Sequence, residues 1–377
     1  MRAQHTFGLN LSWMRVTTVF LIDLGILAIA RHWPDQLGSA ARAWWPGVGL
    51  AALVSLAALI THRRVPLTTV AAARLADRFA DPATLLTQGR TAAFDHRRRY
   101  SRDVVGFRVY RGRLVTVIAA APPPPSRHRR GPEPVTSLPA GLIAEHLRQF
   151  DVRLDSIDVV SVHTGETDGL ATGNTWLILR MDPMHNTDAV AVRDSVAATL
   201  AAATERLAHD LQECHIATRV LEAAEFDQVD AAVLAGLQPA RIRRRRRRLK
   251  QRQPEGPKHF AATFWVSPRD IDSANLEQLW EPDVDATAVT VRLAAQRGRT
   301  EVSVLARYHS AGRLRRKSWA GLNRFNGRQL AALRSSLPTP TRRPLAVPAR
   351  TLERDEALAV PLGPAAREPL ARIEVPA

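Results

Sequence analysis

Two long apolar runs near the N-terminus constrain what this chain can fold into more than any other feature. The second run, Trp44–Ile60, contains no charge, and the first, Val16–Ala30, is apolar except for Thr17, Thr18 and Asp23. A membrane-spanning helix needs about 20 mainly apolar residues, within a range of roughly 17–25. Both runs reach that length with their flanks. Helix, short polar loop and helix therefore predict a transmembrane hairpin over residues 1–64, with spans at about 11–30 and 44–61.

A cleaved signal peptide is the alternative interpretation of the first run, with Arg2 and Arg15 as its basic region and Ala28–Ala30 as a small-residue cleavage site. The aspartate inside the run and the second run directly after it favour the uncleaved hairpin. Arginines flank the hairpin on its outer sides, and the short loop carries only Arg31 and Arg42. The positive-inside rule then predicts a two-pass protein with both termini in the cytoplasm.

Asp23 is an acid inside a predicted span. Such a residue is by default a functional candidate, facing a partner helix or a water-filled path. The apolar runs Val16–Ala30 and Trp44–Ile60 contain no second charge with which Asp23 could form a proton relay. We therefore predict that Asp23 takes part in packing between the helices.

The remaining residues alternate between strand and helix patterns. Apolar runs at 104–110 and 113–121, joined by Arg111-Gly112, predict a hairpin, and runs at 288–295 and 300–308 predict a second. Further strands are expected near 157–163 and 175–181, and helices near 140–150, 187–213, 223–237 and 328–336. Interleaved elements of this kind predict a mixed α/β fold with both sheet faces covered, spanning residues 65–337 in the cytosol. Prolines and charges dominate 338–377, which we predict to be a flexible tail.

Motifs that carry chemistry are scarce. No phosphate-binding loop, dinucleotide-binding glycine motif or H-E-x-x-H motif occurs, and Cys214 is the only cysteine. Asp283 and Asp285 form a D-x-D pair that could hold a divalent metal against a sugar nucleotide, as in a glycosyltransferase-like enzyme. The pattern is weak, and a polar turn before a strand is the simpler interpretation. The sequence thus predicts no catalytic residue and no cofactor.

The net charge of the chain is +17, and it is most concentrated in one basic run. Residues 241–252 (RIRRRRRRLKQR) are predicted to form a loop. The run contains no aromatic residue, which disfavours specific nucleic-acid binding, whereas anionic lipid attracts basic residues beside a membrane. Anionic lipid or an acidic partner is therefore favoured over a membrane-tethered nucleic-acid binder, with a solvated loop as the remaining alternative. The candidate contact residues are Arg243, Arg244, Arg245, Arg246, Arg247 and Arg248.

Several blocks across residues 1–338 carry a family resemblance. MRAQHTFGLNLSWMRVTTVFLIDLGIL, AFDHRRRYSRDVVGFRVYRGRLVTVI, TWLILRMDP and RDSVAATLAAATERL resemble the EccE family, a membrane component of the mycobacterial type VII (ESX) secretion system, closest to the branch that exports PE and PPE proteins. The resemblance implies a non-catalytic structural subunit in the inner membrane, with EccB, EccC and EccD type components and the phospholipid bilayer as partners and no nucleic acid. It gives no role to the arginine run.

Overall fold

The computed structural model describes residues 7–9, 13–31, 45–62, 65–66, 81–99, 103–122, 137–165, 172–193, 195–245, 248–251, 259–296, 298–312, 314–341 and 344–363, with isolated positions at 68, 71–72, 75 and 79. The chain divides into two compact units. The N-terminal unit is Gln4–Phe79, and the larger unit is Ala80–Ala377 with Met1–Ala3.

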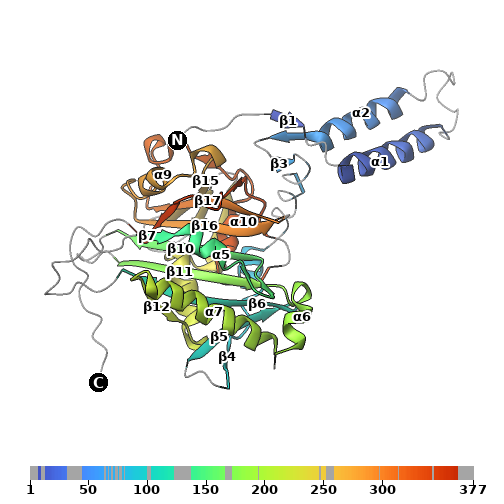
Figure 1. Cartoon of the computed structure of the whole chain (residues 1–377). Coiled ribbons are helices and arrows are strands. Elements are labelled where there is room, and N and C mark those ends of the chain that lie inside the picture. Colours follow the sequence, from blue (N-terminus) through green and yellow to red (C-terminus); the bar gives the residue numbers. More distant parts are fainter. Residues whose placement is uncertain are drawn as a thin grey trace. The chain divides into compact units, whose positions relative to one another are not determined.

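The N-terminal unit is a helical hairpin with a small sheet at one end (Figure 1). Helices α1 (Trp13–Arg31) and α2 (Trp45–Leu59) lie side by side. Strand β1 (Phe7–Leu9), just before α1, pairs antiparallel with β2 (Ile60–His62), which follows α2 directly and pairs in turn with β3 (Val65–Pro66). The start of α1 and the end of α2 are therefore tied together, and the two helices run antiparallel.

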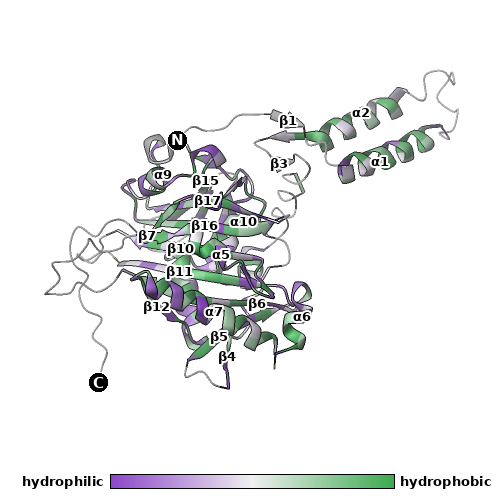
Figure 2. Cartoon of the chain, viewed as in Figure 1, coloured by the Kyte–Doolittle hydropathy of each residue, from purple (hydrophilic) through white to green (hydrophobic). Residues whose placement is uncertain are grey.

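Small side chains bring α1 and α2 together. The buried residues of α2 are Gly47 and Ala51, and that of α1 is Val19. A Cβ atom added at Gly47 would lie only 2.4 Å from Cβ of Ala30, so the helices approach too closely there for any side chain. Large apolar residues cover the outward surfaces (Figure 2). In the described part of the chain, α1 alone is long and apolar enough to cross a membrane, and α2 is a shorter apolar helix of 15 residues.

The larger unit is built on one thirteen-stranded sheet whose strands pair antiparallel (Figure 1). Ten strands follow the order β13-β14-β15-β17-β16-β10-β11-β6-β5-β4, while β12, β18 and β19 pair with β6, β15 and β17. The strands are β4 (Phe94–Arg97), β5 (Val104–Tyr110), β6 (Arg113–Ala121), β10 (Ser156–Thr164), β11 (Thr172–Met181), β12 (Ala217–Val220), β13 (Ile242–Arg245), β14 (Arg248–Gln251), β15 (His259–Trp265), β16 (Ala286–Gln296), β17 (Arg299–Ser310), β18 (Asn323–Arg324) and β19 (Arg350–Thr351).

Both faces of this sheet are covered, as the strand sequences predict. On β10, Ile157 and Val159 join one buried cluster and Val160 and Val162 join another, because successive side chains of a strand point to opposite faces. Helices α5 (Ala140–Glu145), α7 (Val196–Glu213) and α9 (Ser273–Gln278) pack on the first face. Helices α4 (Pro82–Thr87), α8 (Phe226–Leu234) and α10 (Gln329–Ser335) pack on the second. The mixed α/β prediction is confirmed in this coarse form.

Strand order divides the sheet into two halves that meet at one ladder. Strands β6, β10 and β11 with α5 and α7 form one strand–helix–strand–strand–helix series, and β15, β16 and β17 with α9 and α10 form the next. The pairs between β10 and β16 run from Ser156 opposite Ala294 to Thr164 opposite Ala286 and join the halves. Helices α7 and α10 cover opposite faces, so the halves share their order of elements but not their packing.

Two predictions of helix boundaries are wrong. The helix expected to continue to Phe150 ends at Glu145, and β8 (Arg148–Gln149) pairs with β9 (Val152–Arg153) instead. The helix expected over 187–213 is two helices, α6 (Thr187–Ala191) and α7, because Ser195 is extended and its side chain caps α7 by accepting from Ala198 N.

The predicted tail also packs over much of its length. Strand β20 (Ala359–Pro361) pairs with β7 (Ser137–Pro139), and Leu352, Leu358 and Val360 are buried. Apolar residues between the prolines supply this burial, so flexibility from residue 338 to 363 was the wrong prediction. Residues 364–377 lie outside the described residues.

The predicted basic loop is a β-hairpin at the edge of the sheet. Strands β13 and β14 pair from Ile242 opposite Gln251 to Arg245 opposite Arg248. Three residues of this hairpin are buried: Ile242, Leu249 and Gln251. The arginine-rich sequence therefore contains a buried set of positions between the charged ones. Charged side chains are common on edge strands because they discourage pairing with other chains. The loop prediction for 241–252 is therefore wrong where the residues are described.

Candidate functional site

Asp283 and Asp285 lie in the segment between α9 and β16, and both are exposed. The backbone holds this segment in place, since Asp285 N donates to His309 O at 3.0 Å and Gly165 N donates to Asp285 O at 2.8 Å. Within the described residues, no group of three or more His, Cys, Asp or Glu side chains could hold a metal ion. The structure therefore places the D-x-D pair in a turn without a third ligand from the described residues.

Asp23 lies in α1 and accepts a hydrogen bond from the Ser55 hydroxyl of α2. The other polar residues of this run are satisfied within the helix, because Thr17 and Thr18 donate to the carbonyls of Trp13 and Met14 at 3.0 and 2.7 Å. Hydrogen bonds between helices in a bilayer stabilise their association by about 0.6–2 kcal/mol. This contact supports a packing role for Asp23, which stays a prediction.

The arginine hairpin β13–β14 presents an unusual charge pattern. Arg243 lies directly opposite Lys250, and Arg245 lies opposite Arg248. Like charges in this position repel each other. Arg243 and Arg245 are exposed, and the Arg248 guanidinium lies over the Phe260 ring at 4.4 Å. The side chain of Arg244 and residues 246–247 lie outside the described part, so the geometry covers half of the six predicted contact residues.

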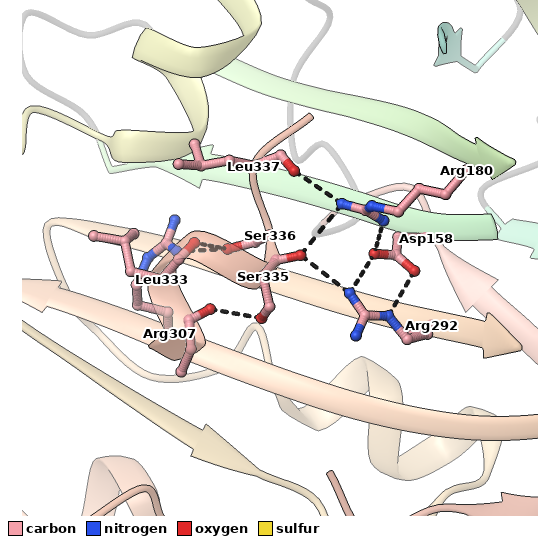
Figure 3. Close-up of polar contacts among 9 residues, drawn as sticks. Asp158, Arg180, Arg292, Arg307, Leu333, Ser335, Ser336 and Leu337 are labelled. Atoms are coloured by element: carbon pink, nitrogen blue, oxygen red, sulfur yellow. Dashed lines mark hydrogen bonds and ion pairs between the residues drawn. The ribbon is translucent and has the colours of Figure 1, made fainter. Parts of the chain in front are cut away.

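The buried charges of the domain, which we did not predict as a site, lie on the face covered by α8 and α10. Asp158 of β10 is fully buried and pairs with Arg180 of β11 and Arg292 of β16 (Figure 3). Arg292 forms two hydrogen bonds to the carboxylate, from Nε at 2.8 Å and from Nη2 at 2.7 Å. Burial alone would raise the pKa of Asp158, but the two guanidinium groups lower it, so the carboxylate stays ionised.

The same two arginines also bind the end of α10. Arg180 Nη2 donates to Leu337 O at 2.9 Å, and Arg292 Nη2 donates to Ser335 O at 3.2 Å (Figure 3). The last carbonyls of a helix have no partner within the helix and need donors from elsewhere. The network of Asp158, Arg180 and Arg292 therefore fastens α10 to the centre of the sheet.

Arg307 of β17 is another buried cation, beside this network. It donates from Nε to His309 Nε2 and from Nη1 to Ser336 Oγ, both at 2.9 Å, and it also bonds Val233 O. Within the described residues it pairs with no carboxylate, and burial lowers its pKa to about 9. His309 shares a second hydrogen bond, of 3.0 Å, with His259, and burial together with Arg307 lowers the pKa of His309 well below its usual value.

A third charged group fastens α8 to the sheet. Asp230 of α8 is fully buried and accepts from Arg90 Nε and from Arg108 Nη1 of β5, both at 2.7 Å. Asp227, one turn earlier, accepts from Arg108 Nη2 at 2.9 Å. The three groups share one function, which is to attach the helices of the second face to the strands.

These residues carry a recognisable sequence signal that we did not use. Four of them are single charges inside otherwise mainly apolar strands: Arg108 in VVGFRVY, Asp158 in SIDVVSV, Arg180 in WLILRM and Arg292 in VTVRLAA. Buried charges are almost always paired, so such isolated charges predict mutual contacts. Among the described contacts of these charged residues, no nucleophile lies beside a base. The arginine donors bond instead to carbonyls at the end of α10 and to the Asp158 carboxylate.

Comparisons with known proteins bear on function. A family profile described as "Putative type VII ESX secretion system translocon, EccE" matches residues 170–266, which run from before β11 to the end of β15. The "ESX-5 secretion system protein EccE5" of Mycobacterium tuberculosis (strain ATCC 25618 / H37Rv) is 44% identical over 401 residues, covering 96% of this chain and 97% of that protein. The protein of the same name from Mycobacterium marinum (strain ATCC BAA-535 / M) is 44% identical over 398 residues, with the same coverage.

Proposed function

Because this chain belongs to the EccE family of type VII ESX secretion translocon components, we propose that it is a non-catalytic structural subunit of an ESX-5 type complex in the inner membrane. In that complex it supports the export of PE/PPE and Esx-type proteins. The observation that carries this proposal is 44% identity to an ESX-5 component over 96% of the chain. The buried charges agree with it, because their described hydrogen bonds fix helices to the sheet.

The partners we propose are the EccB, EccC and EccD type components, together with the phospholipid bilayer, and we expect no nucleic acid. The test is affinity purification of the tagged full chain from membranes in mild detergent, followed by mass spectrometry. Recovery of these components with the chain is the expected result. Purification of the chain without any of them would refute the proposed function.

For the membrane we propose two passes with both termini in the cytoplasm. Pairing of β1 with β2 supports this, since it requires both ends of the hairpin to lie on the same side. Helix α2, with 15 residues, spans about 22 Å against a hydrocarbon core of about 30 Å, so flanking residues or local thinning must make up the difference. Reporter fusions before Phe7 and after His62 should report the same compartment, and opposite compartments would refute the topology.

For the arginine hairpin we propose contact with anionic lipid or an acidic partner protein. Exposed Arg243 and Arg245, each opposite another cation, support this, because an anion would relieve the repulsion across the ladder. Each basic residue near an anionic surface adds about 1 kcal/mol.

The test compares two double variants with the same net charge. Arg243→Gln with Arg245→Gln should reduce binding of the purified full chain to phosphatidylglycerol vesicles, or its recovery with other components. The control, Arg269→Gln with Arg354→Gln, removes two exposed arginines elsewhere. Equal behaviour of the two double variants in both assays would refute the role of the hairpin.

A further inference from the structure

The turn between β8 and β9 presents an aromatic side chain to solvent in a strained backbone conformation. Phe150 and Asp151 are the two turn residues, and the Phe150 side chain is 87% exposed. Its φ angle is +55°, a left-handed conformation that Asn and Gly adopt readily and a bulky residue does not. Phenylalanine here neither buries apolar surface nor favours the turn, so folding gives no reason for its presence.

The structure holds this ring in a defined position. The Arg206 guanidinium of α7 lies 5.4 Å from the ring centroid and donates to Gln149 Oε1 at 3.2 Å. Gln149 is buried and donates to the Ala203 carbonyl of α7 at 3.1 Å, while Val152 opposite it is fully buried. The hairpin is therefore fastened to α7, and the ring is a preorganised projection.

Arginines lie on both strands that flank the turn. Arg148 lies directly opposite Arg153 in the hairpin, and both are exposed. Within the described residues, neither these two nor Arg206 forms an ion pair with a carboxylate. Burial lowers the pKa of Arg206, and the neighbouring cations Arg193 and Arg98 lower it further against the opposite effect of Asp151 and Asp210. An acidic surface on a partner would complement the exposed Arg148 and Arg153.

A carboxylate at the tip of the turn distinguishes a protein from a membrane as the occupant. Asp151, next to Phe150, pairs with Arg193 at 2.6 and 2.9 Å and remains solvent-exposed. The hydrogen bond from Arg193 lowers the pKa of Asp151, so the group stays ionised. Insertion of the ring into an anionic bilayer would carry this charge with it, which is costly. A protein pocket can receive the ring and leave Asp151 at its rim.

We propose that the segment Arg148–Arg153, the Phe150 turn, is a docking anchor for another protein. The partner receives the ring in an apolar pocket bordered by carboxylates that face Arg148, Arg153 and Arg206. Aromatic and arginine side chains carry most of the binding energy in many interfaces, and a rigid anchor loses little entropy on binding. The proposal rests on the proposed function, in which the chain is one subunit of a secretion complex.

The test replaces the ring without disturbing the turn. Phe150→Asn keeps a residue that favours positive φ, so the full chain should reach wild-type levels in membranes and unfold at an unchanged temperature in mild detergent. Recovery of partner subunits in affinity purification should fall about tenfold. Ala235→Asn is the matched control, because Ala235 also has positive φ, at +45°, and packs on the opposite sheet face.

A second variant tests the charges without touching the turn. Arg148→Glu with Arg153→Glu keeps a like-charge pair across the hairpin but reverses the sign shown to the partner, and it should lower recovery as Phe150→Asn does. Wild-type recovery with both variants would overturn this proposal and leave the proposed function intact. Loss of binding to phosphatidylglycerol vesicles with unchanged partner recovery would also overturn it, in favour of lipid. A wild-type chain that purifies alone would overturn both.

Discussion

Replacing Asp158 by Asn tests whether the buried charge network holds the domain together. Asp158 is fully buried and is the carboxylate shared by Arg180 and Arg292. The substitution preserves the size of the side chain and one acceptor oxygen, but it leaves two buried guanidinium groups without a counter-charge. Arg307, another buried cation on this face, already has no carboxylate partner in the described structure.

The expected cost follows from these contacts. Removing one partner of a buried ion pair costs about 3–5 kcal/mol, because the remaining charge stays buried and uncompensated. Asp158 serves two cations, which places the cost near the upper end. The carbonyls of Ser335 and Leu337 continue to accept from the guanidinium groups and limit it. A loss of about 4–5 kcal/mol is a large part of the 5–15 kcal/mol that stabilises a typical domain.

Pulse proteolysis of the full chain in mild detergent over a urea series would measure this loss as a change in the free energy of unfolding. A matched variant separates charge from packing. Asp158→Leu with Arg180→Met and Arg292→Met removes all three charges and leaves no uncompensated ion. It should cost only about 2–3 kcal/mol, less than Asp158→Asn, because the carbonyls of Ser335 and Leu337 lose their donors. A change below about 1 kcal/mol for Asp158→Asn would refute the reasoning.

Three further predictions concern backbone contacts and pH. Gly106→Ala should destabilise the domain by about 1–3 kcal/mol through overpacking, since the new Cβ would lie 2.6 Å from the backbone at Glu222; urea unfolding checks this, and an unchanged midpoint would contradict it. Gly47→Leu should separate α1 from α2, because even a Cβ would lie 2.4 Å from Ala30, and cysteine cross-linking across the helices would report whether the contact survives. The lowered pKa of His309 keeps its ring neutral in the folded chain. The unfolded chain binds more protons at acidic pH, so the free energy of unfolding should fall as the pH drops below about 6.5. A flat stability profile between pH 7 and 5 would count against burial of a neutral ring.

Elements with a strong local pattern were predictable from the sequence. The β5–β6 hairpin has its turn at Arg111-Gly112, where both residues have positive φ, at the boundaries the apolar runs predict. Strands β10, β11, β16 and β17 follow the β-branched runs. The family resemblance is confirmed by relatives that cover nearly the whole chain.

Elements specified by long-range contacts were not predictable in this way. The β8–β9 pair has two residues per strand, too few to show a period, and only contacts with α7 reveal why Gln149 is buried. In β13–β14 the arginines conceal the buried set of Ile242, Leu249 and Gln251. Deleting Arg243–Arg248, which a loop would tolerate, would instead remove the hairpin and uncover the edge of β15. Asp158 finds its partners 22 and 134 residues further along the chain, so no local window contains both.

The ladder between β10 and β16 has a consequence for synthesis of the chain. β10 is complete at Thr164, but its partner begins only at Ala286, about 120 residues later. At about 5–20 residues per second the ribosome needs roughly 6–24 s to supply that partner. During that time an apolar strand that ends up at the centre of the sheet is an open edge, available to any other extended chain. Slower translation between these two points would lengthen the exposure of this edge and favour aggregation over assembly.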